Sequence, residues 1–487
     1  MRRNWGTNGL DRRVFLAGTA AAILAPQVSH AQSAAKPEAI SEVIARFVAG
    51  LDLKSVPPLA IERARVAFID TVGVMLVGAQ EKAAEIVHDI IKLEGAKPAA
   101  GIVGTSLRTS AQNAALANGI ASHALDFDLT YVQGQLTASL VPALLPLAES
   151  TGATQAEVLA AYLAGFEVVS RLSRANPNHN GGGLWHGTST IGSIGAAVAA
   201  ARLLKAPAGA IPDIVGISVS LASGVNANYG TMTKPLHAGN AAKNGILAAM
   251  LGIRGFSSNP QAIEGRGGFA KTFARGLEWK PEAFNDLGKQ YDIVVNGYQP
   301  KRYPCGGVIH TAIDAALLLR EKLGADVGNI ASIHAGIARY AADRAKPEYP
   351  TNTEAAKFNL QYVVGYSLAH GVPKLAAFDP PAISDPAVKA MAQKVTASID
   401  PEFADARQNY PTRLKVTLKD GRVVEELRRA ASGTAEFPLT QAQIEEKFLD
   451  CATHAVDKAT ADKILLSLRT LGDTPSLDGL WPLLRKA

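Results

Sequence analysis

Residues 230–243 hold side chains that could do chemistry at close spacing. They include two hydroxyls, two ammonium groups and an imidazole, among them Lys234 and His237. Pro235 disfavours the α conformation at Lys234, so we predict extended chain there and a helix capped near Asn240. A helix N-terminus suits an anion, because it offers free N–H groups and a positive dipole end. The stretch therefore predicts a carboxylate-binding, proton-handling corner of an active site, and a surface turn with solvated cations is the alternative.

A second stretch combines an imidazole and two carboxylates with apolar residues. Its pattern predicts one helix from Asn118 to Leu129, which carries His123, Asp126 and Asp128. His123 and Asp126 could bind a metal only with further ligands, so no metal site is predicted. Asp126 could instead be an interior carboxylate held by its neighbours, since buried acids are normally paired. Asp128 is interpreted as structural.

Length, charge and cysteine content limit the possible classes of protein. At 487 residues the chain is long enough for two domains and a large core. The net charge is +6, but residues 1–31 hold four arginines and one aspartate, so the remainder carries +3. No basic run interleaved with aromatic residues remains, so no nucleic-acid partner is expected. No apolar run reaches the ~18 residues of a membrane span. Two cysteines, Cys305 and Cys451, cannot build a disulfide framework, although a single bridge stays open.

The N-terminus has the layout of a secretory signal. The sequence Asp11-Arg12-Arg13-Val14-Phe15-Leu16 precedes an apolar stretch from Ala17 to Ala25, and Ser29-His30-Ala31 is typical of a cleavage site. Adjacent arginines before Phe-Leu favour the twin-arginine type, which exports folded proteins. We therefore predict a signal peptide over residues 1–31 and a periplasmic or exported protein. A cytosolic protein with an amphipathic N-terminal helix is the alternative.

Hydrophobic periodicity predicts helices in most of the chain, with one mixed region. Residues 36–285 are predicted as an all-helical domain, followed by a smaller α+β domain at 290–430. In that domain Ile293 to Val295, Ile330 to Ile337 and Arg413 to Leu418 are expected as strands, the last followed by an Asp-Gly hairpin turn. Residues 435–487 are expected to return to the helical domain, starting with a capping box at Thr440. The predicted fold class is mainly α.

Six motifs in the same order are similar to those of the family of 2-methylcitrate dehydratase, the MmgE/PrpD family, which also includes cis-aconitate decarboxylase and an iminodisuccinate epimerase. The resemblance covers nearly the whole chain after the predicted signal. It implies a large helical domain and a smaller α+β domain with the site between them, usually in a homodimer, and no cofactor. The motifs are Asp70-Thr71-Val72-Gly73, Ala117-Asn118-Gly119 with His123-Ala124-Leu125-Asp126-Phe127-Asp128, Trp185-His186-Gly187-Thr188, Thr233 to Asn240, Lys301-Arg302-Tyr303-Pro304-Cys305, and Phe358 to Gly371.

The resemblance also implies a set of site residues. Lysines and a threonine would hold the carboxylates of a small polycarboxylate, and His186 would act as acid or base. A core histidine at 186 and a solvated Lys301 are the alternatives, while His237 either contacts substrate or packs at the helix start. Carried over to this sequence, the catalytic set is His186, Lys234, Lys301 and Asp126, and the substrate-binding set is Thr130, His237 and Tyr362.

Two positions depart from the family pattern. Gln135 and Leu136 stand where the decarboxylases and dehydratases carry a His-Pro pair, and Gly306 stands where the decarboxylase has a second histidine. The loss of two imidazoles makes decarboxylation doubtful. The reactions of the family all make or protonate a carbanion beside a carboxylate, and cations held against that carboxylate stabilise the transition state. We therefore predict a dehydratase-like lyase, with an α-carbon epimerase or a catalytically idle binding relative as alternatives.

Overall fold

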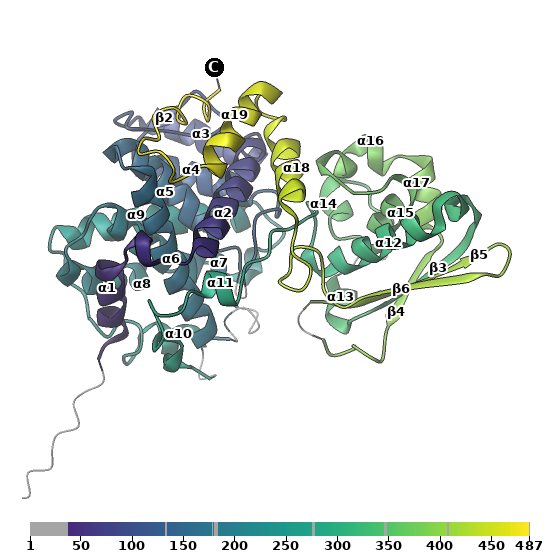
Figure 1. Ribbon diagram of the computed structural model, residues 1–487, viewed down its shortest axis with the longest axis horizontal. Helices are drawn as coiled ribbons and strands as arrows, with labels where there is room; N and C mark the ends of the chain where they lie inside the picture. Colours follow the sequence, from purple (N-terminus) through teal and green to yellow (C-terminus); the bar gives the residue numbers. More distant parts are fainter. Residues whose placement is uncertain are drawn as a thin grey trace, which may run out of the picture. The chain divides into compact units, whose positions relative to one another are not determined.

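The described part of the chain is built mainly from α-helices, so the predicted fold class is confirmed (Figure 1). The computed structural model describes residues 38–131, 134–177, 179, 184–274, 278–344, 348–406 and 409–486. The predicted signal peptide lies outside these residues. The helices are α1 (Ile40–Gly50), α2 (Pro58–Gly78), α3 (Lys82–Glu94), α4 (Ala111–His123), α5 (Thr137–Thr151), α6 (Gln155–Ala175), α7 (Gly187–Leu203), α8 (Ile211–Leu221), α9 (Thr233–Ile253), α10 (Phe269–Ala274), α11 (Asp292–Val295), α12 (His310–Leu323), α13 (Arg339–Arg344), α14 (Thr353–Ala356), α15 (Leu360–His370), α16 (Pro380–Ile383), α17 (Pro386–Ala392), α18 (Gln441–Ala452) and α19 (Lys458–Arg469).

The first helices pack around α7, which is buried along almost its whole length. Its run of alanine, glycine and serine lets α5, α6 and α9 approach closely. The contact between α4 and α9 depends on two glycines. A Cβ at Gly119 would lie 2.6 Å from the Cα of Gly239, so the backbones touch where a side chain would keep them apart. This close packing fixes α9 beside the helix that leads to Asp126.

A second buried cluster surrounds a four-stranded sheet in the order β4-β3-β5-β6. Strands β3 and β4 are parallel, whereas β5 pairs antiparallel with both β3 and β6. The expected strands at 330–337 and 413–418 and the hairpin turn at Asp420-Gly421 are confirmed. Helices α12 and α15 lie beside the sheet, and α17 packs on α15 (Figure 1). The strands are β1 (Ala100–Gly101), β2 (Arg108–Thr109), β3 (Ile330–Ile337), β4 (Val395–Ile399), β5 (Thr412–Leu418) and β6 (Val423–Arg428).

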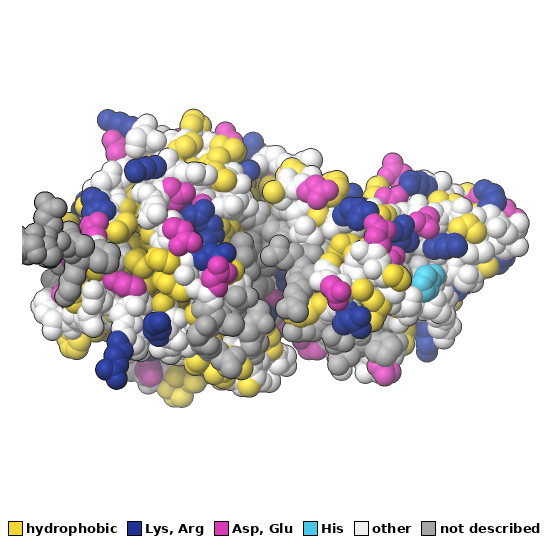
Figure 2. Space-filling model, turned by 90° about the horizontal axis from the view of Figure 1, so that it is seen from below, with side chains coloured by type: hydrophobic (Ala, Val, Ile, Leu, Met, Phe, Trp, Pro, Cys, Tyr) yellow, Lys and Arg dark blue, Asp and Glu magenta, His cyan; other side chains and the backbone are white. Residues whose placement is uncertain are grey.

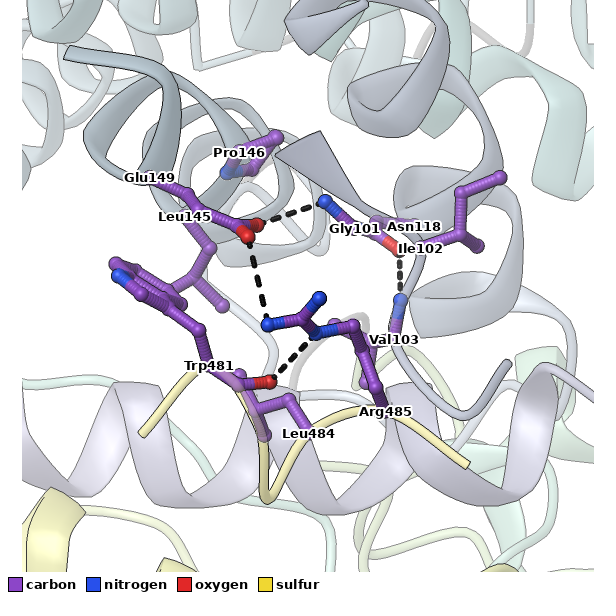
Figure 3. A pocket seen from close by; sticks show the side chains of 10 residues that line it. All are labelled: Gly101, Ile102, Val103, Asn118, Leu145, Pro146, Glu149, Trp481, Leu484 and Arg485. Atoms are coloured by element: carbon purple, nitrogen blue, oxygen red, sulfur yellow. Dashed lines mark hydrogen bonds and ion pairs between the residues drawn. The ribbon is translucent and has the colours of Figure 1, made fainter. Parts of the chain in front are cut away.

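The last segment packs on the first helices. Thr440 and Gln443 form the expected capping box at the start of α18, and α18 lies against α2. Further on, Arg485 and Trp481 line a small hollow together with Glu149 (Figure 3). The Glu149 carboxylate accepts a 2.7 Å hydrogen bond from the Gly101 N–H and lies 3.9 Å from the Arg485 guanidinium. The C-terminal residues therefore close this hollow against β1 and α5.

Two predicted elements are wrong. Ile293 to Val295 belong to the short helix α11, because the Glu167 carboxylate accepts hydrogen bonds from the N–H groups of Asp292 and Ile293 and so caps a helical turn. The helix expected at 118–129 ends at His123, and the residues after it form turns.

The described residues include no helix both long and apolar enough to cross a membrane. On the face in Figure 2, cationic and anionic side chains are interspersed rather than gathered in a field of one sign.

Candidate active site

The candidate site is centred on Asp126, in the turn that follows α4. Its backbone has a φ of 53°, a conformation that aspartate adopts more readily than most residues. The Lys301 ammonium donates 2.6 Å to the Asp126 carbonyl oxygen and 2.8 Å to its Oδ2. Lys301 thus holds both the backbone and the carboxylate of this turn.

Lys234 reaches the same carboxylate from another element. Its Nζ lies 2.6 Å from Asp126 Oδ1, so the two ammonium groups bind one oxygen each. Burial alone would raise the pKa of Asp126, but Lys234 and Lys301 together hold that pKa well below its usual range. The carboxylate is therefore ionised at neutral pH. A single negative charge faces two positive charges, which leaves the group cationic and suited to a further carboxylate.

The prediction of extended chain at Lys234 is wrong. Helix α9 begins at Thr233, so Lys234 lies in its first turn, and Asn240 lies inside the helix rather than at its cap. Pro235 is accommodated because the first-turn N–H groups of a helix have no intrahelical partner, so its missing N–H costs nothing there.

Gln135 connects the central carboxylate to a second one. Its Nε2 donates 2.8 Å to Asp126 Oδ1 and lies 3.3 Å from Asp128 Oδ1. The backbone N–H of Gln135 donates to the hydroxyl of Thr188, in the first turn of α7. Gln135, which the sequence analysis predicts to stand where the family has a histidine, is therefore held by its backbone and by its side chain, and it presents an amide to both carboxylates.

Three imidazoles lie together beside this group. His186 precedes α7, and its Nδ1 is 3.1 Å from His237 Nδ1, so one of the two nitrogens carries the hydrogen. His186 also stacks on His123, with ring centroids 5.3 Å apart. Burial lowers the pKa of His186 well below its usual value, and neighbouring His123 and Lys234 lower it further. His186 is therefore neutral at pH 7 and available to accept a proton.

Gly306, the second position at which the sequence analysis predicts a departure from the family pattern, packs closely against a phenyl ring. A Cβ at Gly306 would lie 2.7 Å from Phe358 Cδ1, so the phenyl ring occupies the space that a histidine side chain needs. The adjacent Cys305 is a buried free thiol, as is Cys451, and the bridge left open by the sequence is absent. The Nε2–H of His310 donates to the Cys305 carbonyl oxygen at 3.2 Å, and burial lowers the pKa of His310 to about 3.

The structure brings together five of the seven predicted residues, namely Asp126, His186, Lys234, His237 and Lys301. Thr130 lies four residues after Asp126, and its hydroxyl donates a 3.0 Å hydrogen bond to the Gln299 carbonyl oxygen. Tyr362 is fully buried in the cluster around the sheet, and its hydroxyl donates to the Ala377 carbonyl. Tyr362 is therefore placed in a core rather than with the other five. Within the described ranges, no three or more His, Cys, Asp or Glu side chains are grouped as a metal site requires.

A buried ion pair supports the central turn from behind. Lys447 on α18 pairs with Asp70 on α2 and donates 2.7 Å to the Phe127 carbonyl. The other Asp70 oxygen accepts a 3.0 Å bond from the N–H of Leu129. The pair therefore holds the backbone on the C-terminal side of Asp126. The motif at Asp70 is visible in the sequence, but nothing in the sequence joins it to a lysine near the other end of the chain.

Replacing Lys447 by methionine is expected to lower the free energy of unfolding by about 3–5 kcal/mol, because the buried Asp70 carboxylate loses its counter-charge. Urea denaturation followed by circular dichroism measures the change. Lys374→Met is the matched control, since it breaks the exposed Lys374–Glu446 pair beside the same helix. That control is expected to cost at most about 1 kcal/mol. Equal effects of the two substitutions would contradict a supporting role for the buried pair.

The family of the chain follows from its sequence relatives. Residues 42–282 match the MmgE/PrpD N-terminal domain, and residues 303–472 match the MmgE/PrpD C-terminal domain. The chain belongs to the MmgE/PrpD family, as the motifs predict. The cis-aconitate decarboxylase of Homo sapiens is 27% identical over 466 residues, covering 92% of this chain and 95% of the relative. That of Mus musculus is 25% identical over 474 residues, covering 92% and 94%. That of Aspergillus terreus is 26% identical over 479 residues, covering 92% and 96%. Membership supports a lyase-type enzyme at the level of the family.

Proposed function

We propose that the protein is a cofactor-independent, dehydratase-like lyase that acts on a small di- or tricarboxylate through an α-carbanion. The observation that carries the proposal is the convergence of Lys234 and Lys301 on one carboxylate. The two ammonium groups come from α9 and from the segment before α12, and each lies within 2.8 Å of Asp126. A substrate carboxylate that joined or replaced Asp126 there would meet two cations already in place.

The chemistry needs charge stabilisation beside a proton acceptor. When a base removes the proton next to a carboxylate, negative charge moves onto that carboxylate as an enediolate. The lysines would bind this form more tightly than the ground state, which lowers the barrier. His186, neutral because burial depresses its pKa, would accept the proton. Loss of the β-hydroxyl as water would then complete a dehydration.

A specific observation favours a second candidate, an epimerase at an α-carbon. Gln135 replaces a family imidazole and is tied to two carboxylates, and Phe358 fills the space of another. An epimerisation needs only the removal and return of one proton, so it places fewer demands on additional acid groups than dehydration or decarboxylation does. The remaining alternative is a family member that binds a small acid but does not catalyse a reaction.

The test is to incubate the full chain in deuterium oxide with a panel of small polycarboxylates, including cis-aconitate, and to follow each by NMR. Formation of an unsaturated product with loss of water is the expected result. Deuterium at the α-carbon with no new product would identify the epimerase. Loss of carbon dioxide would identify a decarboxylase. Binding without exchange would contradict both enzyme proposals and favour the binding relative.

A further inference from the structure

His123 and Asp128 form a buried pair that the proposed chemistry has not yet used. His123 Nδ1 lies 3.1 Å from Asp128 Oδ1 and 3.0 Å from Oδ2, and both side chains are completely shielded from solvent. Because an ionised carboxylate can only accept, the hydrogen in this contact belongs to Nδ1. In the neutral form of the ring, the lone pair is therefore on Nε2.

That lone pair has no partner among the described residues. His123 Nε2 is buried, and no neighbouring donor lies within hydrogen-bond distance. Buried polar atoms are nearly always paired, so an exception at an oriented imidazole calls for a functional reason. A carboxylate on Nδ1 with a free Nε2 is the arrangement by which proton-transferring histidines are held in hydrolases, because the carboxylate fixes the tautomer and stabilises the imidazolium.

The His123–Asp128 pair also contacts residues of the candidate site. The His123 ring stacks on His186, with centroids 5.3 Å apart and planes 26° apart. Gln135 links Asp128, the hydrogen-bond partner of His123, to the lysine-bound carboxylate of Asp126. His123 therefore contacts His186 directly and is connected to the lysine-bound Asp126 through Asp128 and Gln135.

We propose that His123, oriented by Asp128, is a second proton-transfer group of this site, working beside His186; the inference rests on the proposed function. His186 takes the α-proton of the substrate, as proposed above, and the electron pair of the broken C–H bond becomes the enediolate held by the lysines. His123 Nε2 then accepts that proton from His186, and Asp128 faces the resulting imidazolium. The same proton then passes to the β-hydroxyl, which leaves as water while the electron pair forms the carbon–carbon double bond. In the epimerase alternative, the proton-transfer groups return a proton to the α-carbon instead.

The first test reads the tautomer without any turnover. In the full chain labelled with ¹⁵N-histidine, NMR should show hydrogen on Nδ1 of His123 and a lone pair on Nε2. Tricarballylate, an unreactive tricarboxylate, is the probe, and its binding should shift the Nε2 signal. Hydrogen on Nε2, or binding of tricarballylate with the His123 signals unchanged, would overturn the inference and leave the proposed function intact.

The second test compares variants in the exchange assay. Asp128→Asn can donate to Nδ1 and so reverse the tautomer, which should lower the rate by about 10²–10⁴. His123→Asn is the second variant, used in case Asp128→Asn does not fold, and it should cause a loss of similar size. His88→Asn is the matched control, because His88 on α3 is another buried histidine whose Nε2 has no partner among the described residues.

The outcomes separate the two proposals. Loss of exchange in the His123 and Asp128 variants, with His88→Asn unchanged, supports the inference. Exchange at the wild-type rate in both variants overturns it while the proposed function stands. If the wild-type chain neither exchanges nor converts any acid in the panel, the proposed function fails and the inference fails with it.

Discussion

Lys301→Met is expected to lower kcat/KM by about 10²–10³, the usual loss when one donor to a developing oxyanion is removed. Methionine keeps the length of the side chain and fits a position that is only 4% exposed. It removes the bond to the Asp126 carbonyl as well as the bond to its carboxylate. The effect should fall mainly on kcat, because charge on the substrate carboxylate is greatest in the transition state. Steady-state kinetics with the acid that the exchange panel identifies would measure it.

Two further variants show whether the loss of activity in Lys301→Met comes from the loss of the positive charge at this position. Lys301→Arg keeps the positive charge and should retain more activity than Lys301→Met, although a guanidinium cannot reproduce both short contacts. Lys243→Met removes a lysine further along α9 and is expected to leave kcat/KM unchanged. A Lys301→Met enzyme within about threefold of wild type would contradict the proposed clamp, provided that thermal unfolding shows it to be folded.

Local patterns in the sequence predicted much of the fold because each has a local physical cause. The strand at 412–418 alternates between buried and more exposed residues and is followed by an Asp-Gly turn, and Thr440 and Gln443 have the spacing of a capping box. The errors arise where a residue distant in the sequence determines the local secondary structure. Glu167 caps residues 292–295 into a helix, although their composition favours a strand.

The candidate site was predictable in its residue types but not in its connections. The sequence motifs around Lys234 and Lys301 mark both lysines as candidate site residues. The sequence does not show that both bind Asp126. The sequence pattern predicts a helix through residue 129, so it does not predict the turn after His123. That turn lets Asp126 and Asp128 contact different partners. Asp128 in particular was interpreted as structural. Its contact with His123 depends on the chain leaving the helix at residue 123, and hydrophobic periodicity cannot report that.

His186→Asn is expected to lower kcat by about 10²–10⁴, the range found when a general acid or base is removed. Asparagine can still form a polar contact with His237, so the fold of the surrounding segment should persist. The comparison with His237→Asn is informative, because His237 contacts His186 through Nδ1 and would act by fixing its hydrogen rather than by meeting the substrate. The His237 variant should therefore lose less activity than the His186 variant.

The pH profile distinguishes a catalytic His186 from a structural one. Burial, reinforced by His123 and Lys234, lowers the pKa of His186 well below 6.5, so the neutral base is present at pH 7 and disappears only in more acidic solution. The fall of kcat/KM in acidic solution should accordingly occur well below pH 6.5 in the wild type. In His186→Asn, the part of this fall that is caused by protonation of His186 should be missing. Folding stability should also decline below pH 6.5, because the unfolded chain binds a proton that the native imidazole does not. A variant that keeps the wild-type rate and acid limb would place proton transfer on another group.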